Sequence, residues 1–404
     1  MLNFRTVTPG RGVQVLDCTL FFVGLTAFAP APQLAFEGAE GAGRFAAGGR
    51  GGVELRVTNL NDDGPGSLRA AVNQKGARII RFDVAGTIRL KSDLVIRNPR
   101  ITITGEGAPA GGVAIADHGL VINADDVIVR YFRSRLGDQS KAESDAISIA
   151  GGSRIILDHV SASWSVDETL SVSARYGKGS GIYDVTVQWS IIAESLRKGG
   201  HAKGEHGYGS LVRGGRGSRF SFHHNLWAHH VARMPRPGNY TPASEDPEGP
   251  IIDFRSNVFY NWGGKASGYN ADKDSIASYS FVDNAYVAGP DSKGRMIFKE
   301  ENPNARSWFA GNSVDGKIAA DQWSLVEGSP ARLSQPLQVA PVKPDPAASA
   351  YARVLARAGA SWPRDSVDAR VVAGVRARTG RIIDSQVEVG GWPDLSKPAM
   401  AETK

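Results

Sequence analysis

The sequence predicts an all-β protein whose parallel strands wind into a solenoid, and two observations carry that prediction. From about residue 53 the 404-residue chain is a series of short β runs, and no long helical pattern separates them. These runs recur at a spacing near thirty residues, which is typical of solenoids with several short strands in each coil. A β-propeller is the alternative, but its hairpins favour Asn-Gly and Asp-Gly pairs, which are rare here.

The repeat is defined by eight short runs that align on an apolar third residue. Successive anchors lie 26, 28, 30, 35, 32, 27 and 28 residues apart. Because a coil buries its inward side chains only by stacking on the next coil, we expect the anchors to form a row through the core. The anchors are Ile103, Val129, Leu157, Val187, Phe222, Phe254, Phe281 and Phe309.

A second feature recurs with the last four anchors. An asparagine stands three residues after each, and the four are Asn225, Asn257, Asn284 and Asn312. Amide side chains in equivalent turns of successive coils can hydrogen-bond to one another and satisfy their buried donors and acceptors. The sequence therefore predicts an asparagine ladder along the solenoid.

Both ends of the repeat region carry helical signals. Residues 67–73 form a short helical stretch, which we expect to cap the open end of the solenoid. In the tail, segments 351–359 and 364–380 place apolar residues at helical spacing. Asp365 or Ser366 is the expected N-cap of the second helix, and Gly380 its expected end. We expect both helices to pack on the side or end of the solenoid.

The N-terminus resembles an export signal. The apolar run 19–29 follows Arg5 and Arg11 and is too short to span a bilayer. Cys18, the only cysteine, precedes this run, so a secreted chain would contain no disulfide. We therefore expect three parts: a signal peptide at 1–35, a solenoid domain at 36–340 and a helical extension at 341–404.

The charge balance indicates an acidic partner without identifying it. The formal net charge is +6, which fits nucleic acid, an anionic membrane surface or an acidic polysaccharide, and also fits ordinary solubility charge. One basic stretch, FSFHHNLWAHHVARMPRPG at 220–238, holds four histidines together with Arg233 and Arg236. Pro235 and Pro237 cannot donate ladder hydrogen bonds, so we expect the arginines to lie in a stiff, exposed loop.

Three interpretations of this stretch can be weighed. A zinc site is disfavoured, because adjacent histidines on a strand point apart and no carboxylate lies at a familiar spacing. A nucleic-acid site is disfavoured, because aromatic residues are not interleaved with many lysines and arginines. The histidines then either pack and hydrogen-bond at coil turns, or the loop forms the edge of an active site.

Several ordered motifs resemble the pectate lyase family of polysaccharide lyases. They are SDAISIAGGSRIILDHVSASWSVDETLSV, HAKGEHGYG and FSFHHNLWAHHVARMPR. Two further segments resemble those of bacterial members of the family, namely AFEGAEGAGRFAAGGRGG and DSVDARVVAGVRARTGRIIDSQVEVGGWP. The resemblance therefore covers most of the chain from about residue 36. It implies a right-handed parallel β-helix, secretion, a calcium cofactor, and β-elimination of polygalacturonate to 4,5-unsaturated oligogalacturonides.

The resemblance also implies a calcium site. The calcium carboxylates correspond to Glu143, Asp145 and Asp167. Where the family often has a further Asp, four residues after Asp167, this chain has Ser171 as the corresponding metal position. Glu168 could supply the missing oxygen, but neighbours on a strand point to opposite faces, so we expect it to face away.

The resemblance further implies the catalytic and substrate-binding residues. The catalytic arginine corresponds to Arg233, and a lysine that is both catalytic and substrate-binding corresponds to Lys203. Arg236 is expected to bind a substrate carboxylate, while the position of a second substrate-binding arginine is Gly238. The pair 158–159, Asp-His, corresponds to a structural pair that we expect to make coil hydrogen bonds.

The chemistry explains why such residues are needed. Elimination removes the C5 proton of galacturonate, next to a carboxylate, and expels the C4 oxygen. A bound Ca²⁺ and Lys203 would offset the developing negative charge. Free arginine stays protonated even at pH 9. Arg233 can therefore act as the base only if neighbouring positive charges lower its pKa, and an alkaline optimum would follow. The alternative is that Arg233 orients the substrate carboxylate while water is the base.

Two other functions remain open from the sequence. A β-helical glycoside hydrolase acting on pectin would use aspartates as acid and base, for instance Asp145, Asp158 and Asp167. A non-catalytic polysaccharide-binding protein would keep affinity without turnover. For the lyase we expect an acidic polysaccharide as partner, no nucleic acid, no membrane span, a monomeric state and secretion to the periplasm or the medium.

Overall fold

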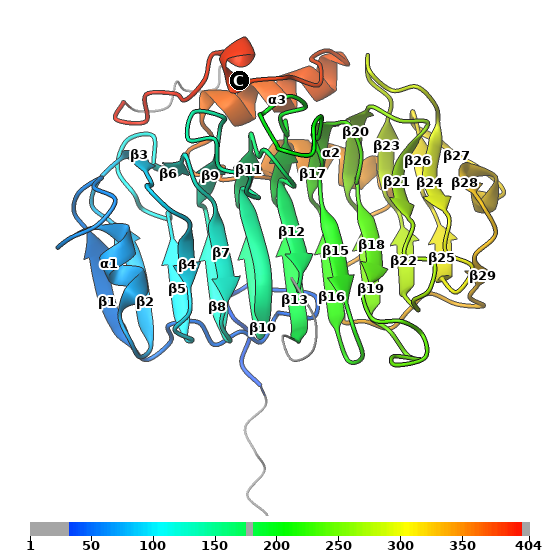
Figure 1. Ribbon diagram of the computed structural model, residues 1–404, viewed down its shortest axis with the longest axis horizontal. Coiled ribbons are helices and arrows are strands. Elements are labelled where there is room, and N and C mark those ends of the chain that lie inside the picture. Colours follow the sequence, from blue (N-terminus) through cyan, green and yellow to red (C-terminus); the bar gives the residue numbers. More distant parts are fainter. Residues whose placement is uncertain (1–31, 175–180, 398–404) are drawn as a thin grey trace, which may run out of the picture. The chain divides into compact units, whose positions relative to one another are not determined.

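The computed structural model describes residues 32–174 and 181–397, and the chain from Gln33 onward forms one compact unit (Figure 1). The predicted signal peptide falls almost entirely on residues 1–31, which lie outside the described residues. No described helix is long and apolar enough to cross a membrane. The proposed boundary between residues 340 and 341 stays a prediction.

The chain winds through parallel sheets, and a typical coil gives one strand to each of three sheets in turn. The strands of the first sheet, in spatial order, are β1 (Val53–Val57), β2 (Arg78–Phe82), β5 (Ile101–Thr104), β8 (Val127–Arg130), β10 (Ile147–Asp158), β13 (Ile182–Gln188), β16 (Arg219–His223), β19 (Ile251–Arg255), β22 (Ser278–Val282), β25 (Arg306–Ala310) and β29 (Ala331–Arg332). Those of the second are β3 (Gly86–Arg89), β6 (Val113–Ala116), β9 (Arg133–Arg135), β11 (Ser161–Ser163), β14 (Ile191–Ala193), β17 (Leu226–His230), β20 (Val258–Trp262), β23 (Ala285–Val287), β26 (Ser313–Val314) and β27 (Lys317–Ile318), the last antiparallel to β26.

The third sheet positions the candidate site. Its strands are β4 (Leu94–Ile96), β7 (Leu120–Asn123), the first part of β10, β12 (Leu170–Ser173), β15 (Leu211–Gly214) and β18 (Arg236–Asn239). A short parallel sheet follows, made of β21 (Ala266–Asn270), β24 (Met296–Glu300) and β28 (Val326–Glu327). Because β10 is long, it belongs to both the first and the third sheet.

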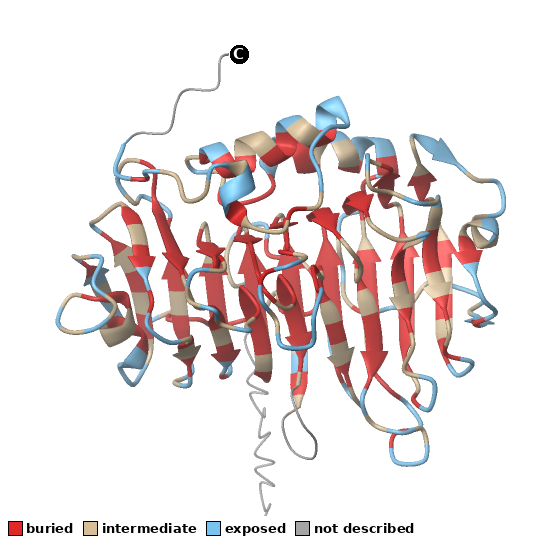
Figure 2. Ribbon diagram, turned by 45° about the horizontal axis from the view of Figure 1, so that its top comes forward, coloured by how far each residue is buried: buried red, intermediate tan, exposed pale blue. Residues whose placement is uncertain are grey.

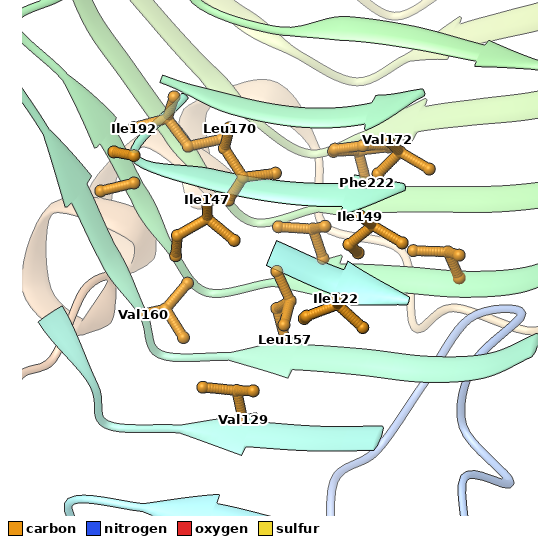
Figure 3. Packing of buried hydrophobic residues seen from close by; sticks show 14 of the residues in the cluster. Ile122, Val129, Ile147, Ile149, Leu157, Val160, Leu170, Val172, Ile192 and Phe222 are labelled. Atoms are coloured by element: carbon orange, nitrogen blue, oxygen red, sulfur yellow. The ribbon is translucent and has the colours of Figure 1, made fainter. Parts of the chain in front are cut away.

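The predicted repeat is confirmed by the register of the first sheet. Each anchor pairs directly with the next, from Ile103 opposite Val129 to Phe281 opposite Phe309. Figure 3 shows Val129, Leu157 and Phe222 in the packed interior. The rings of Phe281 and Phe309 are nearly parallel, with centroids 5.2 Å apart. Each fully buried anchor contributes about 1.5–3 kcal/mol of hydrophobic stabilisation, so the row holds the coils together.

The predicted asparagine ladder is also confirmed. The Nδ2 of Asn225 donates to Asn257 Oδ1 at 3.1 Å, and Asn257 donates in the same way to Asn284 at 3.0 Å. Asn284 continues to Asn312 at 2.9 Å, and Asn312 ends the ladder on Gln322 Oε1. Each ladder amide also donates to a backbone carbonyl of the coil before it, so every rung joins neighbouring coils.

The N-terminal cap is helix α1 (Leu68–Asn73), which lies at the β1 end of the solenoid (Figure 1). Ser67 caps it by accepting from the Ala70 amide. Leu68, Ala71 and Val72 are buried in the main core, so α1 covers the open apolar end as the sequence predicted. Near the other end lies the 3₁₀ helix η1 (Gln322–Leu325).

The tail helices α2 (Ala347–Arg357) and α3 (Ser366–Ala377) pack on the second sheet, with their buried faces turned toward it (Figure 2). Asp365 is the N-cap of α3 and accepts from the Asp368 amide. The expected end at Gly380 was wrong: α3 ends at Ala377, because Arg378 adopts the left-handed conformation. A 3₁₀ helix, η2 (Gln386–Val389), follows. The predicted fold class, a parallel β-helix with a cap and a packed helical tail, is confirmed.

Candidate active site

One cleft of about 770 Å³ lies on the outer face of the third sheet. Every site residue predicted from the sequence lines it, and the seven are Glu143, Asp145, Asp167, Ser171, Lys203, Arg233 and Arg236. They come from segments up to ninety-three residues apart in the chain, and the coils stack those segments side by side. The seven predicted residues therefore belong to a single site, while the role of each residue stays a prediction.

Strand alternation explains which side chains reach the cleft floor. On β12, Leu170 and Val172 are buried in the core, so Ser171 and Ser173 point outward. Ser171 lies in register with Ser148 of β10. The floor is thus made of small hydroxyl side chains, which leave space between the acidic and the basic walls.

The acidic wall differs from the predicted ligand set. Asp145, Asp167 and Glu168 each place one carboxylate oxygen within 4.8 Å of the others. The expectation that Glu168 faces away was wrong, because β12 begins only at Leu170 and strand alternation does not apply before it. The Glu168 amide donates to Asp145 Oδ1 at 3.3 Å, which ties the two acids together.

Glu143 and Ser171 line the same cleft as this acidic cluster, defined as Asp145, Asp167 and Glu168. Glu143 Oε1 accepts from the Ala202 amide at 3.0 Å, and its Oε2 lies 3.5 Å from His201 Nε2. The Ser171 hydroxyl is buried and has no hydrogen-bond partner among the described residues. Glu143 therefore fastens the neighbouring loop, and Ser171 offers an unsatisfied oxygen to the cleft.

Two histidines in the cleft were not singled out from the sequence. His201 and His206 stack with ring centroids 3.7 Å apart, and their Nε2 atoms lie 3.9 and 3.8 Å from the Asp167 carboxylate. They belong to the loop between β14 and β15 that carries Lys203, whose amide donates to His201 Nδ1 at 3.0 Å. The motif HAKGEHGYG contained this signal, because its histidines flank the lysine that was chosen.

Arg233 reaches across the cleft from the loop between β17 and β18. Its backbone is left-handed, with φ of 61°, a conformation that costs a non-glycine residue about 1–3 kcal/mol and is concentrated at functional sites. The guanidinium forms an ion pair with Glu168 and lies 4.0 Å above the ring centroid of Tyr208. Burial raises the pKa of Tyr208, with smaller effects from Tyr269 and Asp167, so the ring under Arg233 is a neutral phenol.

The expected stiff, exposed loop was only partly right. Arg236 begins strand β18 and pairs with Leu211 of β15, so the polypeptide returns to the sheet directly after Pro235. Only 17% of the Arg236 side chain is exposed, and its Nη2 donates to Asp272 Oδ1 at 3.0 Å. Gly238 contributes no side chain. The basic wall is therefore held in place by hydrogen bonds.

The four histidines of segment 220–238 are buried, and His223 bonds through its Nδ1 to His224 Nδ1 at 2.9 Å. His224 bonds to Asp345, His229 to Asn261, and His230 to Ser195 Oγ at 2.6 Å. Burial lowers the pKa of His224 to about 4 and that of His230 to about 3. These side chains make coil contacts, which is the first of the two interpretations that the sequence left.

The aspartate set of the hydrolase alternative does not assemble. Asp158 is fully buried, accepts from Arg130 Nε at 2.8 Å and bonds to His159 Nδ1 at 2.9 Å. It is not among the residues that line the cleft with Asp145 and Asp167. The expected structural role of the 158–159 pair is confirmed by these bonds.

Comparison with known proteins identifies the family. No protein-family model matches the chain. A probable pectate lyase C of Aspergillus flavus is 33% identical over 378 residues, which cover 90% of this chain and 83% of that protein. The probable pectate lyase C of Aspergillus fumigatus is 36% identical over 386 residues, covering 91% and 84%.

The fold comparison agrees with the sequence relatives. A solved structure of a pectate lyase bound to a hexasaccharide superposes with a TM-score of 0.60 at 13% identity, covering 83% of this chain and all of that one. At that identity the superposition supports the fold alone. Identity of 33–36% across nine-tenths of the chain, however, shows common family membership. The chain belongs to the pectate lyase family.

Proposed function

We propose that this protein is a polysaccharide lyase that cleaves pectate, the polygalacturonate chain, by β-elimination and leaves 4,5-unsaturated oligogalacturonides. The observation that carries the proposal is the meeting of an acidic cluster and Arg233 in one cleft. Relatives named pectate lyase and a fold neighbour with a bound hexasaccharide support the substrate class.

The residues present fit a calcium ion. Ca²⁺ takes six to eight oxygen ligands, and Asp145, Asp167 and Glu168 converge within 4.8 Å. Ser171 Oγ is buried without a hydrogen-bond partner in the described part of the chain, so it can add a neutral oxygen. Glu143 is the fifth candidate, since its half-exposed carboxylate lies at the same end of the cleft. When bound there, Ca²⁺ supplies positive charge that offsets the substrate carboxylate and makes the C5 proton more acidic.

The basic residues then have distinct tasks. The C5 proton leaves, the C5–H electron pair becomes the C4–C5 double bond, and the C4–O bond breaks with its electrons on the departing oxygen. Arg233 lines the cleft, and we propose that it either takes the C5 proton as the base or binds the substrate carboxylate while a water molecule takes that proton. The base role requires its ion pair with Glu168 to open first, because that pair holds only a charged guanidinium.

Lys203 and Arg236 add two further positive charges to the cleft besides that of Arg233. Lys203 is an exposed side chain on the loop that covers the acidic end, so it can approach the substrate carboxylate as a mobile point charge. Arg236 is fixed to Asp272 and offers a rigid, planar donor set to a neighbouring sugar. We propose that both bind substrate and that Lys203 also stabilises the transition state.

The deciding experiment is incubation with polygalacturonate, with and without a chelator, while ultraviolet absorbance and reducing ends are followed. A calcium-dependent rise in absorbance from the new double bond is the expected result. Reducing ends without absorbance would mean a hydrolase, and no product with retained binding would mean a binding protein. Either of those results would overturn the proposal.

The cellular setting is part of the same proposal. A polymeric substrate and an apolar leader sequence fit a secreted enzyme. We propose that it works as a monomer outside the cytoplasm. Cell fractionation with the full-length chain and light scattering of the purified protein test these two points.

A further inference from the structure

A third arginine, Arg213, lies next to Arg236 on the cleft wall and was not predicted from the sequence. Arg213 belongs to β15 and Arg236 to β18, the next coil of the same sheet. The Nη2 atoms of both donate to the same oxygen, Asp272 Oδ1, at 2.5 Å and 3.0 Å. One carboxylate thus holds two guanidinium groups side by side.

Gly238 makes this arrangement possible. It is the register partner of Arg213 on β18, and a Cβ at that position would lie 2.0 Å from Asp272 Oδ2. Any side chain at position 238 would displace Asp272. Asp272 can therefore hold its position beside Arg213 of β15 only while position 238 carries no side chain.

The two arginines keep unused hydrogen-bonding capacity. Each guanidinium carries five N–H donors, and the Nε atoms of both have no hydrogen-bond partner among the described residues. The Arg213 guanidinium lies 4.7 Å from the ring centroid of Tyr240, and only 14% of its side chain is exposed. Arg213, Arg236 and Asp272 together carry a formal charge of about +1.

We infer that Arg213 and Arg236, preorganised by Asp272, form a two-arginine clamp for a carboxylate of a uronate chain, separate from the carboxylate at the reaction centre. The inference rests on the proposed function, because it concerns a polymer with one carboxylate on each sugar. A planar guanidinium matches a carboxylate with two parallel hydrogen bonds, and a methyl ester offers neither the charge nor the second acceptor. The clamp therefore selects de-esterified sugars.

The clamp predicts a defined kinetic effect. An interaction that binds ground state and transition state equally changes KM and leaves kcat nearly unchanged. We expect Arg213→Ala to raise KM for polygalacturonate about 10- to 100-fold, as for loss of a charged hydrogen-bonded contact, with kcat within about two-fold. Arg213→Lys keeps the charge and loses the planar fork, so its KM should lie between those of Arg213→Ala and the wild type.

The experiment measures initial rates by ultraviolet absorbance on polygalacturonate and on highly methyl-esterified pectin. Arg295→Ala is the matched control, because Arg295 also pairs with an aspartate, Asp315, but does not line the cleft. Thermal melting checks that each variant folds. If Arg213→Ala does not fold, Arg213→Lys decides on the same readout.

The outcomes separate the clamp from the proposed function. A wild type without unsaturated product overturns the proposed function, and the clamp as a uronate site with it. An active wild type with an unchanged KM in Arg213→Ala overturns the clamp alone. A raised KM for polygalacturonate, together with a smaller preference over esterified pectin, supports it.

Discussion

Arg233 and Glu168 form an ion pair across the cleft, and this pair joins the basic wall to the acidic cluster. Glu168 is fully buried, and its carboxylate also lies within 4.8 Å of ligand atoms of Asp145 and Asp167. The same side chain thus holds the candidate catalytic arginine and one corner of the candidate calcium site. A change at Glu168 should affect both at once.

Glu168→Gln is the first test of this double role. The amide keeps one oxygen for a cation but cannot ion-pair with Arg233, so the arginine loses its fixed position. We expect kcat to fall about 10- to 100-fold, as for loss of a partner that orients an active-site group, and half-maximal activity to need more calcium. Initial rates over a calcium series measure both effects. Glu205→Gln is the control, since Glu205 lines the same cleft but is loosely paired at its exposed edge.

Arg233→Ala separates chemistry from binding. The guanidinium is the group that faces both Glu168 and Tyr208, and removing general base or electrophilic help typically lowers turnover about 100- to 10,000-fold. Binding of a trigalacturonate, followed by calorimetry, should weaken far less than turnover. A variant that retained the full rate would remove Arg233 from the mechanism.

Ser171→Asp should strengthen the calcium site. Its hydroxyl is buried, lines the same cleft as the acidic cluster and has no hydrogen-bond partner in the described part of the chain, so a carboxylate there would add one formal charge to the proposed ligand set. We expect the calcium concentration for half-maximal activity to fall several-fold. The chelated variant should melt at a lower temperature than chelated wild type, because like charges then repel.

The control for this change lies on the same strand. Ser173→Asp places a carboxylate on the same face of β12, two residues or about 7 Å further along. Because Ser173 bonds to Tyr240 and lies opposite Arg213 of the clamp, its variant should show no gain in calcium affinity, although its KM for substrate can change. Equal calcium responses in the two variants would mean that Ser171 is not next to the metal.

The sequence predicted the solenoid well, because its core is one-dimensional. The anchors from Ile103 to Phe309 could be aligned by spacing alone, and each occupies the position opposite the next. The asparagines could be found for the same reason, since a residue that repeats at a fixed distance from an anchor must stack. The end of α3 could not be found, because Arg378 takes the left-handed role that a glycine usually has.

The site was predicted as a set of residues but not as a set of contacts. Glu168 was assigned to the wrong face, because the start of β12 at Leu170 is not marked in the sequence. Arg213 and Asp272 were missed, because they lie in coils other than that of Arg236. The register of β15 with β18 brings Arg213 beside Arg236, and the loop after β21 brings Asp272 to both. Motif resemblance locates residues along the chain, whereas neighbours across coils depend on loop lengths.

Asn257→Ala should destabilise the whole solenoid. The Asn257 amide donates to Phe222 O and Asn284 Oδ1, and its Oδ1 accepts from the Asn225 backbone and side chain. An unsatisfied buried polar group costs about 1–3 kcal/mol, and several would be left, so we expect a loss of about 3–5 kcal/mol. The urea midpoint should fall at an unchanged m-value. Asn304→Ala, at an exposed asparagine that donates to Lys273 O, should change stability by less than about 1 kcal/mol.

Acid should destabilise the fold through the buried histidines, and His230 tests this. Burial lowers the pKa of His230 to about 3 in the folded chain, whereas an unfolded histidine titrates near 6.5. Between those values the unfolded state binds one more proton, so stability rises with pH and is lost progressively as pH falls below about 6.5. His230→Gln removes this proton uptake, although it also disturbs the bonds to Ser195 Oγ and Ile192 O and lowers stability at pH 8. Urea unfolding of both proteins at several values between pH 4.5 and 8 gives the slope of the free energy of unfolding against pH, which counts the protons taken up on unfolding. Below about pH 6 the slope of the variant should be smaller than that of the wild type by close to one proton. Parallel curves for the two proteins would mean that His230 is already protonated in the native state.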